Sequence, residues 1–397
     1  MTGEPTHRAI EAVWRIEAAK IIAGVARLTR DVGVAEELAQ DALVAALEHW
    51  PTAGVPDNPG AWLMATAKNR ALDHLRRDKM LAAKHEQIGH ELDAQEALIV
   101  PDFVDALDAR RSDEIGDDLL RLIFTACHPV LSTEARVALT LRLLGGLTSA
   151  EIARAFLVPE PTIAQRIVRA KRTLAAARVP FELPRGDALA ARLASVLEVI
   201  YLIFNEGYTA TAGDDWMRPA LCDEALRLGR VLASLAPNEP EVLGLAALME
   251  LQASRAAARV DAAGRPVLLL EQDRARWDHL LIRRGLAALE RAESLNGGDL
   301  TTPTGAARPA PRGGAPAPWG GPATRAGSYA LQAAIAACHA RAGVPEQTDW
   351  ARIVALYDAL AQVAPSPVVE LNRAVAVGMA FGPAAALEIV DAMRDEP

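Results

Sequence analysis

The stretch that most constrains this chain is residues 145–174, GGLTSAEIARAFLVPEPTIAQRIVRAKRTL, which has the pattern of a helix-turn-helix. We expect a first helix from Thr148 or Ser149 and a break at residues 158–160. Pro161 is well placed as the first residue of the second helix, a position that proline favours. This part of the chain is therefore predicted to be helical.

The second helix of this motif has one apolar and one polar face. The apolar positions recur at helical spacing and are predicted to be buried: Ile163, Ile167, Ala170 and Leu174. The opposite face carries hydroxyl, amide and guanidinium groups: Thr162, Gln165, Arg166, Arg169 and Arg172. Such groups reach base edges and phosphates from a major groove. An arginine-rich face is otherwise simply solvated, so the turn, the proline and the basic face together predict binding to nucleic acid.

Composition favours an all-α protein of two or three domains. The chain has 397 residues, 51% of them hydrophobic, which is enough to bury several cores. Only 4% are aromatic, and the abundant alanine, leucine and arginine favour helices over strands. The net charge of −9 excludes a protein that coats nucleic acid indiscriminately, so any contact with DNA must come from local basic patches.

Other sequence features indicate a cytoplasmic protein that is not an enzyme. Cys127, Cys222 and Cys338 are far apart and odd in number, as in a reducing compartment. Residues 1–30 lack a signal-peptide core, and no stretch of eighteen apolar residues suggests a membrane span, so we expect no membrane partner. No catalytic grouping, phosphate loop or metal-ligand spacing stands out, so we expect no catalytic residue, cofactor or metal.

The chain divides into four segments. Residues 7–80 are predicted to be helical, 81–114 to be an acidic linker, and 115–178 to be a compact helical unit that ends in the helix-turn-helix. Residues 186–397 form a long Ala/Leu-rich helical region. The proline and glycine of residues 301–327 predict a disordered insert within it.

The C-terminal segment carries a faint internal repeat. Residues 232–252 resemble residues 360–379, each with a helix, an Ala-Pro turn and a second helix. Further helices are expected at 186–204, 220–235, 277–295, 328–342, 349–363 and 383–393. This pattern predicts tetratricopeptide-like stacking of helical pairs, although its spacing is irregular. A non-repeating helical bundle is the alternative, and the sequence leaves both open.

The N-terminal segment contains two amphipathic helices. The first spans 35–50, with an inner face of Leu38, Ala42, Leu43, Ala46, Leu47 and Trp50 and an outer face of Glu36, Glu37, Gln40, Asp41 and Glu48. The second spans 58–79, with an inner face of Leu63, Ala67, Ala71 and Leu75 and an outer face of Lys68, Arg70, Arg76, Arg77 and Lys79. One surface is therefore acidic and the other is basic.

The run W-L-x(5)-N-R-x-x-D-x-x-R at residues 62–76 resembles region 2 of bacterial sigma factors, and residues 119–174 resemble region 4. With no domain between these regions, the chain resembles the extracytoplasmic-function (ECF) group. The segments YLIFNEGYTA, QDRARWDHLLI and YALQAAIAACHA, together with residues 349–377, resemble the ECF subgroup with a fused tetratricopeptide-like extension. Leu157 departs from the pattern, because many region 4 sequences carry glycine there. We therefore expect that turn to be made by another backbone route.

The resemblance implies roles for three sets of residues. Those that would contact a basic clamp of core RNA polymerase are Glu37, Gln40, Asp41 and Glu48. Those near the −10 element would be Asp57 and Asn58 in a base-capturing loop, Trp62 and Asn69 beside the base, and Arg70, Arg76, Arg77 and Lys79 on phosphates. Trp62 could equally belong to the core. Those at the −35 element would be Thr162, Gln165, Arg166, Arg169 and Arg172, with Lys171 near the DNA backbone.

The resemblance thus implies a factor that binds core RNA polymerase and directs initiation at promoter DNA. The C-terminal extension would be a built-in regulatory domain that contacts regions 2 and 4. One alternative is a DNA-binding regulator with a ligand- or peptide-binding helical domain and no affinity for core polymerase. Another is a scaffold whose helical half binds peptides. Failure to bind core polymerase would favour the regulator, and binding of a partner by residues 186–397 alone would favour the scaffold.

Overall fold

The computed structural model describes residues 3–86, 108–185, 187–209, 217–261, 265–298, 300 and 327–394. These residues form α-helices, short 3-10 helices and one isolated β-bridge between Val260 and Pro266, which confirms the all-α class. The chain forms two compact units. Unit 1 comprises Met1–Pro184 and Ala191–Val199, and unit 2 comprises Arg185–Ala190 and Ile200–Pro397.

The helices of unit 1 are α1 (Gly3–Thr29), α2 (Val32–Ala53), α3 (Pro59–Glu86), α4 (Asp108–Ala126), α5 (Thr133–Leu143), α6 (Ser149–Ala155) and α7 (Glu160–Ala176). Helix α8 (Asp187–Tyr208) contributes residues to both units. Unit 2 continues with α9 (Pro219–Leu235), α10 (Pro240–Ala253), α11 (His279–Leu295), α12 (Ser328–Arg341), α13 (Trp350–Val363), α14 (Pro367–Phe381) and α15 (Pro383–Arg394).

Two expected segments lie largely outside the described residues. Of the acidic linker 81–114, residues 87–107 are not described, whereas its two ends are helical as parts of α3 and α4. Of the expected insert 301–327, the structure describes only Gly327, the residue that precedes α12.

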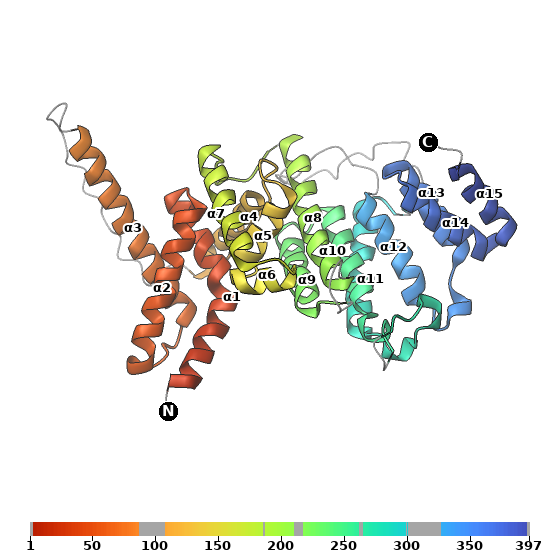
Figure 1. The fold of residues 1–397 in the computed structure, drawn as a ribbon, viewed down its shortest axis with the longest axis horizontal. Helices are drawn as coiled ribbons and strands as arrows, with labels where there is room; N and C mark the ends of the chain where they lie inside the picture. The colour runs from red at the N-terminus through yellow and green to blue at the C-terminus, as the bar shows by residue number, and fades with distance from the viewer. Residues whose placement is uncertain are drawn as a thin grey trace. The chain divides into compact units, whose positions relative to one another are not determined.

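Helices α1, α2 and α3 pack together at the N-terminal end of unit 1 (Figure 1). Asp31 caps α2, because its Oδ1 accepts the backbone N–H groups of Gly33 at 2.7 Å and Val34 at 3.1 Å. The predicted inner faces are largely buried, with Trp50 of α2 and Leu63 of α3 almost inaccessible to solvent. The three helices therefore share a core, and their outer faces are exposed to solvent.

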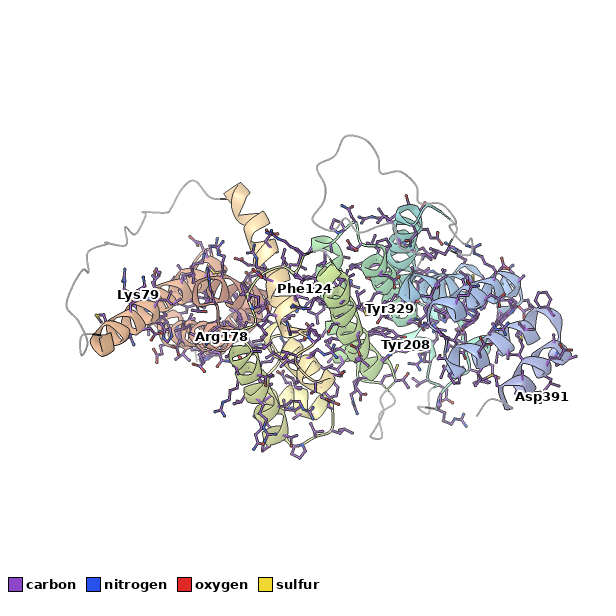
Figure 2. The ribbon with its side chains drawn as sticks, turned by 90° about the horizontal axis from the view of Figure 1, so that it is seen from above. Lys79, Phe124, Arg178, Tyr208, Tyr329 and Asp391 are labelled. Carbon is purple, nitrogen blue, oxygen red and sulfur yellow. The ribbon has the colours of Figure 1, made fainter. Side chains whose placement is uncertain are left out.

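The first half of α8 packs on the end of α4 within unit 1. The last carbonyl groups of a helix have no partner inside that helix. Arg192 Nη2 donates to the Phe124 carbonyl at 2.6 Å, and Ser195 Oγ donates to the Cys127 carbonyl at 2.7 Å. A third link joins Arg136 Nη1 to Glu198 Oε2 at 2.9 Å. Figure 2 labels Phe124 on α4. Residues beyond the helix-turn-helix thus complete the packing of unit 1.

Helix α8 also corrects our expectation about apolar stretches. Its residues Ala188–Tyr208 are long and apolar enough, by length and composition, to cross a membrane. We missed this stretch because charged residues such as Arg192 and Glu198 interrupt it. Half of it is buried inside the structure, and the core helix of a globular protein meets the same criterion. The hydrogen bonds of Arg192 and Ser195 favour that second interpretation.

Unit 2 is built from helices that pack on their neighbours in the chain. Helix α10 is buried on nearly every side against α9, α11 and α12, and α12 to α15 pack in succession (Figure 1). At Gly244 of α10, an added Cβ would lie 2.6 Å from the backbone nitrogen of Ala330, so the close approach of α12 requires glycine. The Glu241 carboxylate accepts the N–H groups of Tyr329 and Ala330 and so caps α12. This packing agrees with tetratricopeptide-like stacking.

Candidate nucleic-acid interface

The helix-turn-helix begins with a capping box. The Thr148 hydroxyl accepts the Glu151 N–H at 3.2 Å, while Glu151 Oε2 accepts the Thr148 N–H at 2.8 Å. That backbone hydrogen bond from Thr148 is the main reason that the pKa of Glu151 is lowered. Thr148, one of the two predicted starts, is therefore the N-cap, and α6 begins at Ser149.

The turn between α6 and α7 differs from our expectation. Leu157 itself adopts the left-handed backbone conformation that glycine favours, with φ of 51°. The expectation that this turn follows another backbone route was therefore wrong. The Val158 N–H donates to the Ala153 carbonyl at 3.0 Å and closes the turn. Helix α7 then begins at Glu160, so Pro161 is its second residue and not its first. A leucine here accepts backbone strain that a glycine would avoid.

Helix α7 has the two faces that its sequence predicts. The apolar residues Ile163, Ile167, Ala170 and Leu174 are all buried. The residues of the opposite face are exposed, except that Arg166 is half-buried: Thr162, Gln165, Arg166, Arg169 and Arg172. The site residues proposed for the −35 element therefore lie together along one helix.

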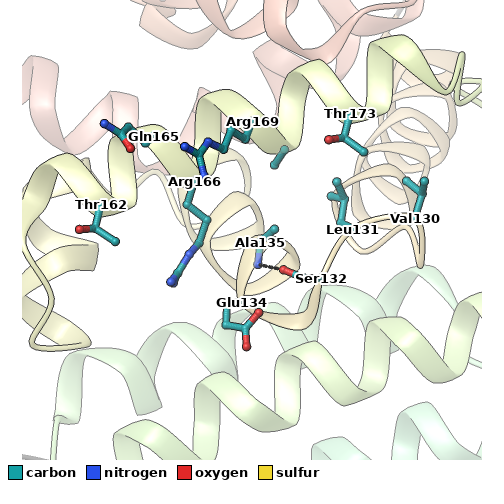
Figure 3. Close-up of a pocket in the computed structure, with 11 residues that line it drawn as sticks. Val130, Leu131, Ser132, Glu134, Ala135, Thr162, Gln165, Arg166, Arg169 and Thr173 are labelled. Carbon is teal, nitrogen blue, oxygen red and sulfur yellow. Dashed lines mark hydrogen bonds between the residues drawn. The ribbon is translucent and has the colours of Figure 1, made fainter.

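A groove of about 430 Å³ runs between α7 and residues 130–135 (Figure 3). Arg166 extends from α7 toward Glu134, a residue that sequence reasoning missed. The pKa of Glu134 is lowered, chiefly by its own backbone N–H and by the Ser132 hydroxyl, with a smaller contribution from Arg166. A carboxylate here offsets part of the positive charge of α7. Its charge acts on Arg166 through space across the groove.

The exposed face of α2 carries three predicted site residues, Glu37, Asp41 and Glu48. Gln40 is half-buried, and its Nε2 donates to Glu36 Oε1 at 2.7 Å. Our assignment of Glu36 to the outer face was wrong, because that residue is only 3% exposed.

The charged partners of Glu36 come from α5 and α7. Arg142 Nε of α5 lies 2.6 Å from Glu36 Oε1, and Lys171 Nζ of α7 forms an ion pair with Glu36 Oε2. Lys171, expected near the DNA backbone, is therefore bound to a carboxylate of α2 in this structure.

Trp62 lies at the border of the core and the surface. It is half-buried, its ring is stacked on His49 with centroids 6.2 Å apart, and it meets the edge of Trp50 at 5.4 Å. Asn58 Oδ1 accepts the Ala61 N–H at 3.1 Å and so shapes the start of α3. Trp62 thus has both a core contact and an accessible part, which matches the two roles left open by the sequence.

The other residues predicted for the −10 element lie in the loop before α3 and along α3. Asp57, Asn58, Asn69, Arg76, Arg77 and Lys79 are exposed. Arg70 Nη1 lies 3.4 Å from Asp41 Oδ2, so one basic residue of this set pairs with the acidic face of α2. A surface ion pair of this kind contributes little to stability and can exchange for another partner.

Among the described residues, no group of three or more His, Cys, Asp or Glu side chains could hold a metal ion. Burial raises the pKa of the Cys127 thiol to about 11, so this cysteine is an unreactive core residue. The exposed polar groups of α2, α3 and α7 are suited to binding rather than to covalent chemistry.

Comparison with known proteins gives matches to three family descriptions. "Sigma-70 region 2" matches residues 17–80, "Sigma-70, region 4" matches 121–174, and "Family of unknown function (DUF6596)" matches 192–293. An uncharacterized protein of Rhizobium meliloti (strain 1021) is 43% identical over 370 residues, which are 93% of this chain and 79% of the relative.

Two further relatives carry functional names. The "ECF RNA polymerase sigma factor SigK" of Mycobacterium ulcerans is 31% identical over 154 residues, covering 38% of this chain and 75% of the relative. The "Probable ECF RNA polymerase sigma factor SigI" of Mycobacterium tuberculosis is 26% identical over 176 residues, covering 44% of this chain and 57% of the relative. No solved structure gives a significant match.

Proposed function

Because this chain belongs to the ECF group of sigma-70 factors, in the subgroup with a fused C-terminal helical extension, we propose that it binds core RNA polymerase and directs it to two-part promoters. Members of this family are not enzymes, and their action is a matter of binding. The observation that carries the proposal is that α7, within the region 4 match, has a continuous polar face opposite its buried apolar face.

The proposed polymerase-binding surface is the acidic face of α2. Glu37, Asp41 and Glu48 are exposed on one helix within the region 2 match, beside the half-buried Gln40. A cluster of carboxylates on a rigid helix favours a basic partner and speeds its association.

The proposed −10 surface is the loop before α3 together with the exposed side of α3. Asp57 and Asn58 would line a pocket for an unstacked base, and Trp62 offers an accessible aromatic ring next to it. Asn69 lies two helical turns beyond Trp62, where an amide can contact a base edge. Arg70, Arg76, Arg77 and Lys79 would bind phosphates of the melted strand.

The proposed −35 surface is α7 in a major groove. Thr162, Gln165, Arg166 and Arg169 would contact base edges, and Arg172 would contact the DNA backbone. Glu134, whose charge acts on Arg166 across the groove, would oppose the approach of phosphates to that end of the site.

The extension is proposed to regulate the promoter-binding half. The hydrogen bonds from Arg192 and Ser195 to carbonyl groups at the end of α4 support this role, because residues 191–199 of α8, the first helix of the extension, are part of unit 1. Fusion also keeps the extension at a high effective concentration near its target. Removal of the extension distinguishes activation from inhibition.

A binding experiment tests the polymerase surface. Glu37→Lys should weaken binding to purified core polymerase about tenfold, equivalent to about 1.4 kcal/mol, because it places a cation where the partner is basic. Glu11→Lys, at an exposed position of α1, makes the same charge change outside that surface and should bind like the wild type. Equal binding by all three proteins contradicts the assignment of α2. A wild-type chain that binds DNA but not core polymerase favours the alternative of a DNA-binding regulator.

A further inference from the structure

Glu36 is a buried carboxylate held by three side chains. Its side chain is 4% exposed, and it accepts hydrogen bonds from Gln40 Nε2 at 2.7 Å and Arg142 Nε at 2.6 Å. The third partner is the ammonium group of Lys171. A buried carboxylate tolerates the loss of water only where cations and hydrogen bonds replace it. We call these four residues the Glu36 latch.

The two cations of the latch lie on α5 and on α7. Arg142 lies at the end of α5, and its Nη1 also donates to the Leu147 carbonyl at 3.1 Å, in the loop before α6. Lys171 lies on α7, and its methylene chain packs on Gly33, where an added Cβ would be 3.6 Å from Lys171 Cδ. The latch therefore joins the start of α2 directly to α7.

The position of the latch links two surfaces. Lys171 is next to Arg172 on the helix proposed to enter DNA, but its side chain is only 20% exposed while it is paired with Glu36. An ammonium group in a buried ion pair cannot neutralise a phosphate at the same time. On the other side, Gln40 is the residue of the latch that lies between Glu37 and Asp41 on the acidic face of α2. A partner that displaces Gln40 therefore removes one of the hydrogen bonds of Glu36.

We propose that Glu36 withholds Lys171 from DNA in the free chain, and that a partner docked on the acidic face of α2 releases this lysine to bind a phosphate. The identity of that partner as core polymerase and the binding of DNA by α7 rest on the proposed function, whereas the pairing of Lys171 with Glu36 does not.

Lysine acylation with an N-hydroxysuccinimide ester, followed by peptide mass spectrometry, measures the latch without DNA. In the full-length chain Lys171 should react at least several-fold more slowly than the exposed Lys79, and Glu36→Gln should bring it close to the rate of Lys79. Glu11→Gln, the same loss of charge at an exposed position of α1, should leave the protection unchanged. Saturating core polymerase should expose Lys171 in the wild-type chain, which tests the release without any substitution.

Binding to a random 40-base-pair duplex measures the consequence. Glu36→Gln should tighten binding several-fold and steepen the dependence of log K on log salt by about one unit or less, because one more cation meets the phosphates. Lys171→Met should change little in the wild-type background and should cancel the gain in the Glu36→Gln background.

The outcomes separate the latch from the proposed function. One outcome is that Lys171 is protected in the wild type and released in Glu36→Gln, but that no variant binds DNA. This result supports the latch and removes the DNA-binding role of α7. If saturating core polymerase does not expose Lys171, docking on α2 does not release this lysine, and the proposed coupling is wrong. Lys171 that reacts as fast as Lys79 in the wild-type chain overturns the latch itself, as does a Lys171→Met effect of equal size in both backgrounds.

Discussion

At the scale of single residues, Leu157 stores strain in the turn of the helix-turn-helix. Its φ of 51° places a branched side chain in the left-handed region, and the residue is 54% exposed. This conformation costs about 1–2 kcal/mol for a residue with a Cβ. Little apolar burial offsets that cost, because so much of the side chain faces solvent.

Replacement of Leu157 by glycine should therefore stabilise unit 1. The relief of strain exceeds the extra backbone entropy of glycine in the unfolded chain, about 0.5–1 kcal/mol, so we expect a net gain of up to about 1 kcal/mol. Urea unfolding followed by circular dichroism measures this change. Gly146→Ala is the matched control, because Gly146 has a φ of 66° with open space around it and should lose stability. A loss of stability in Leu157→Gly would mean that the leucine side chain contributes more than its exposure suggests.

His339 makes unit 2 sensitive to acid. Burial lowers the pKa of this imidazole to about 4, with further lowering by Arg255 and Arg274, and its Nδ1 has no hydrogen-bond partner among the residues that the structure describes. Above pH 6.5 the imidazole is neutral in both the folded and the unfolded chain. Between pH 6.5 and 4 the unfolded chain binds a proton that the folded chain does not, so stability falls as the pH falls.

His339→Phe should remove this part of the pH dependence. The phenyl ring can keep the edge contact with Trp350, whose ring centroid lies 5.3 Å from that of His339. From pH 7 to pH 4.5 the wild type should lose about 2 kcal/mol more than the variant. Chemical denaturation at both pH values gives this difference. Parallel losses in the two proteins would contradict the neutral, buried state of His339.

At the scale of helices, α7 and α3 should contribute differently to DNA binding. Arg166→Ala should relax selectivity at the −35 element, because a good bidentate base contact is worth about 1–3 kcal/mol. Arg77→Ala should weaken binding to all sequences alike and lower the salt slope by about one unit or less. Selection of bound sequences from a random DNA pool, together with salt titrations, distinguishes the two. If Arg166→Ala weakens every sequence equally, that arginine contacts phosphate and α7 lies in a different orientation.

Most helices and the faces of α7 could be predicted from the sequence, because both follow from local spacing. The role of Glu36 could not. A glutamate near the start of an amphipathic helix looks solvent-exposed, and its partner Arg142 is 106 residues away in the chain. Leu157 was missed for a different reason, because the sequence alone does not show whether the rest of a turn supports backbone strain. Glu134 was missed because it comes from another helix than the arginine that it faces.

At the scale of the whole molecule, the C-terminal boundary of the promoter-binding half lies beyond the helix-turn-helix. A chain that ends at Arg178 lacks Arg192 and Ser195, so two carbonyl groups at the end of α4 lose their partners. Each lost hydrogen bond costs about 1–3 kcal/mol where the acceptor stays buried. We therefore expect a chain ending at Arg178 to melt several degrees below one ending at Tyr208, the last residue of α8. Equal melting temperatures by circular dichroism would contradict the structural role of α8.

The fragment that ends at Tyr208 then tests the regulatory role of the extension. It keeps α8 and removes the rest of unit 2, so a change in transcription at matched concentration reports regulation rather than unfolding. An increase means that the extension inhibits, and a decrease means that it is required. Transcription equal to that of the full chain would contradict a regulatory role and favour the scaffold alternative.

Transcription of sheared genomic DNA of the source organism by purified core polymerase, with and without this protein, tests the central claim most directly. Sequencing of the RNA 5′ ends should reveal start sites that depend on the protein and share two upstream sequence blocks. Arg166→Ala should reduce sequence preference in the distal (−35) block and leave that in the proximal (−10) block unchanged. Start sites identical to those of core polymerase alone would contradict the account, because a chain that directs no initiation is not acting as a sigma factor.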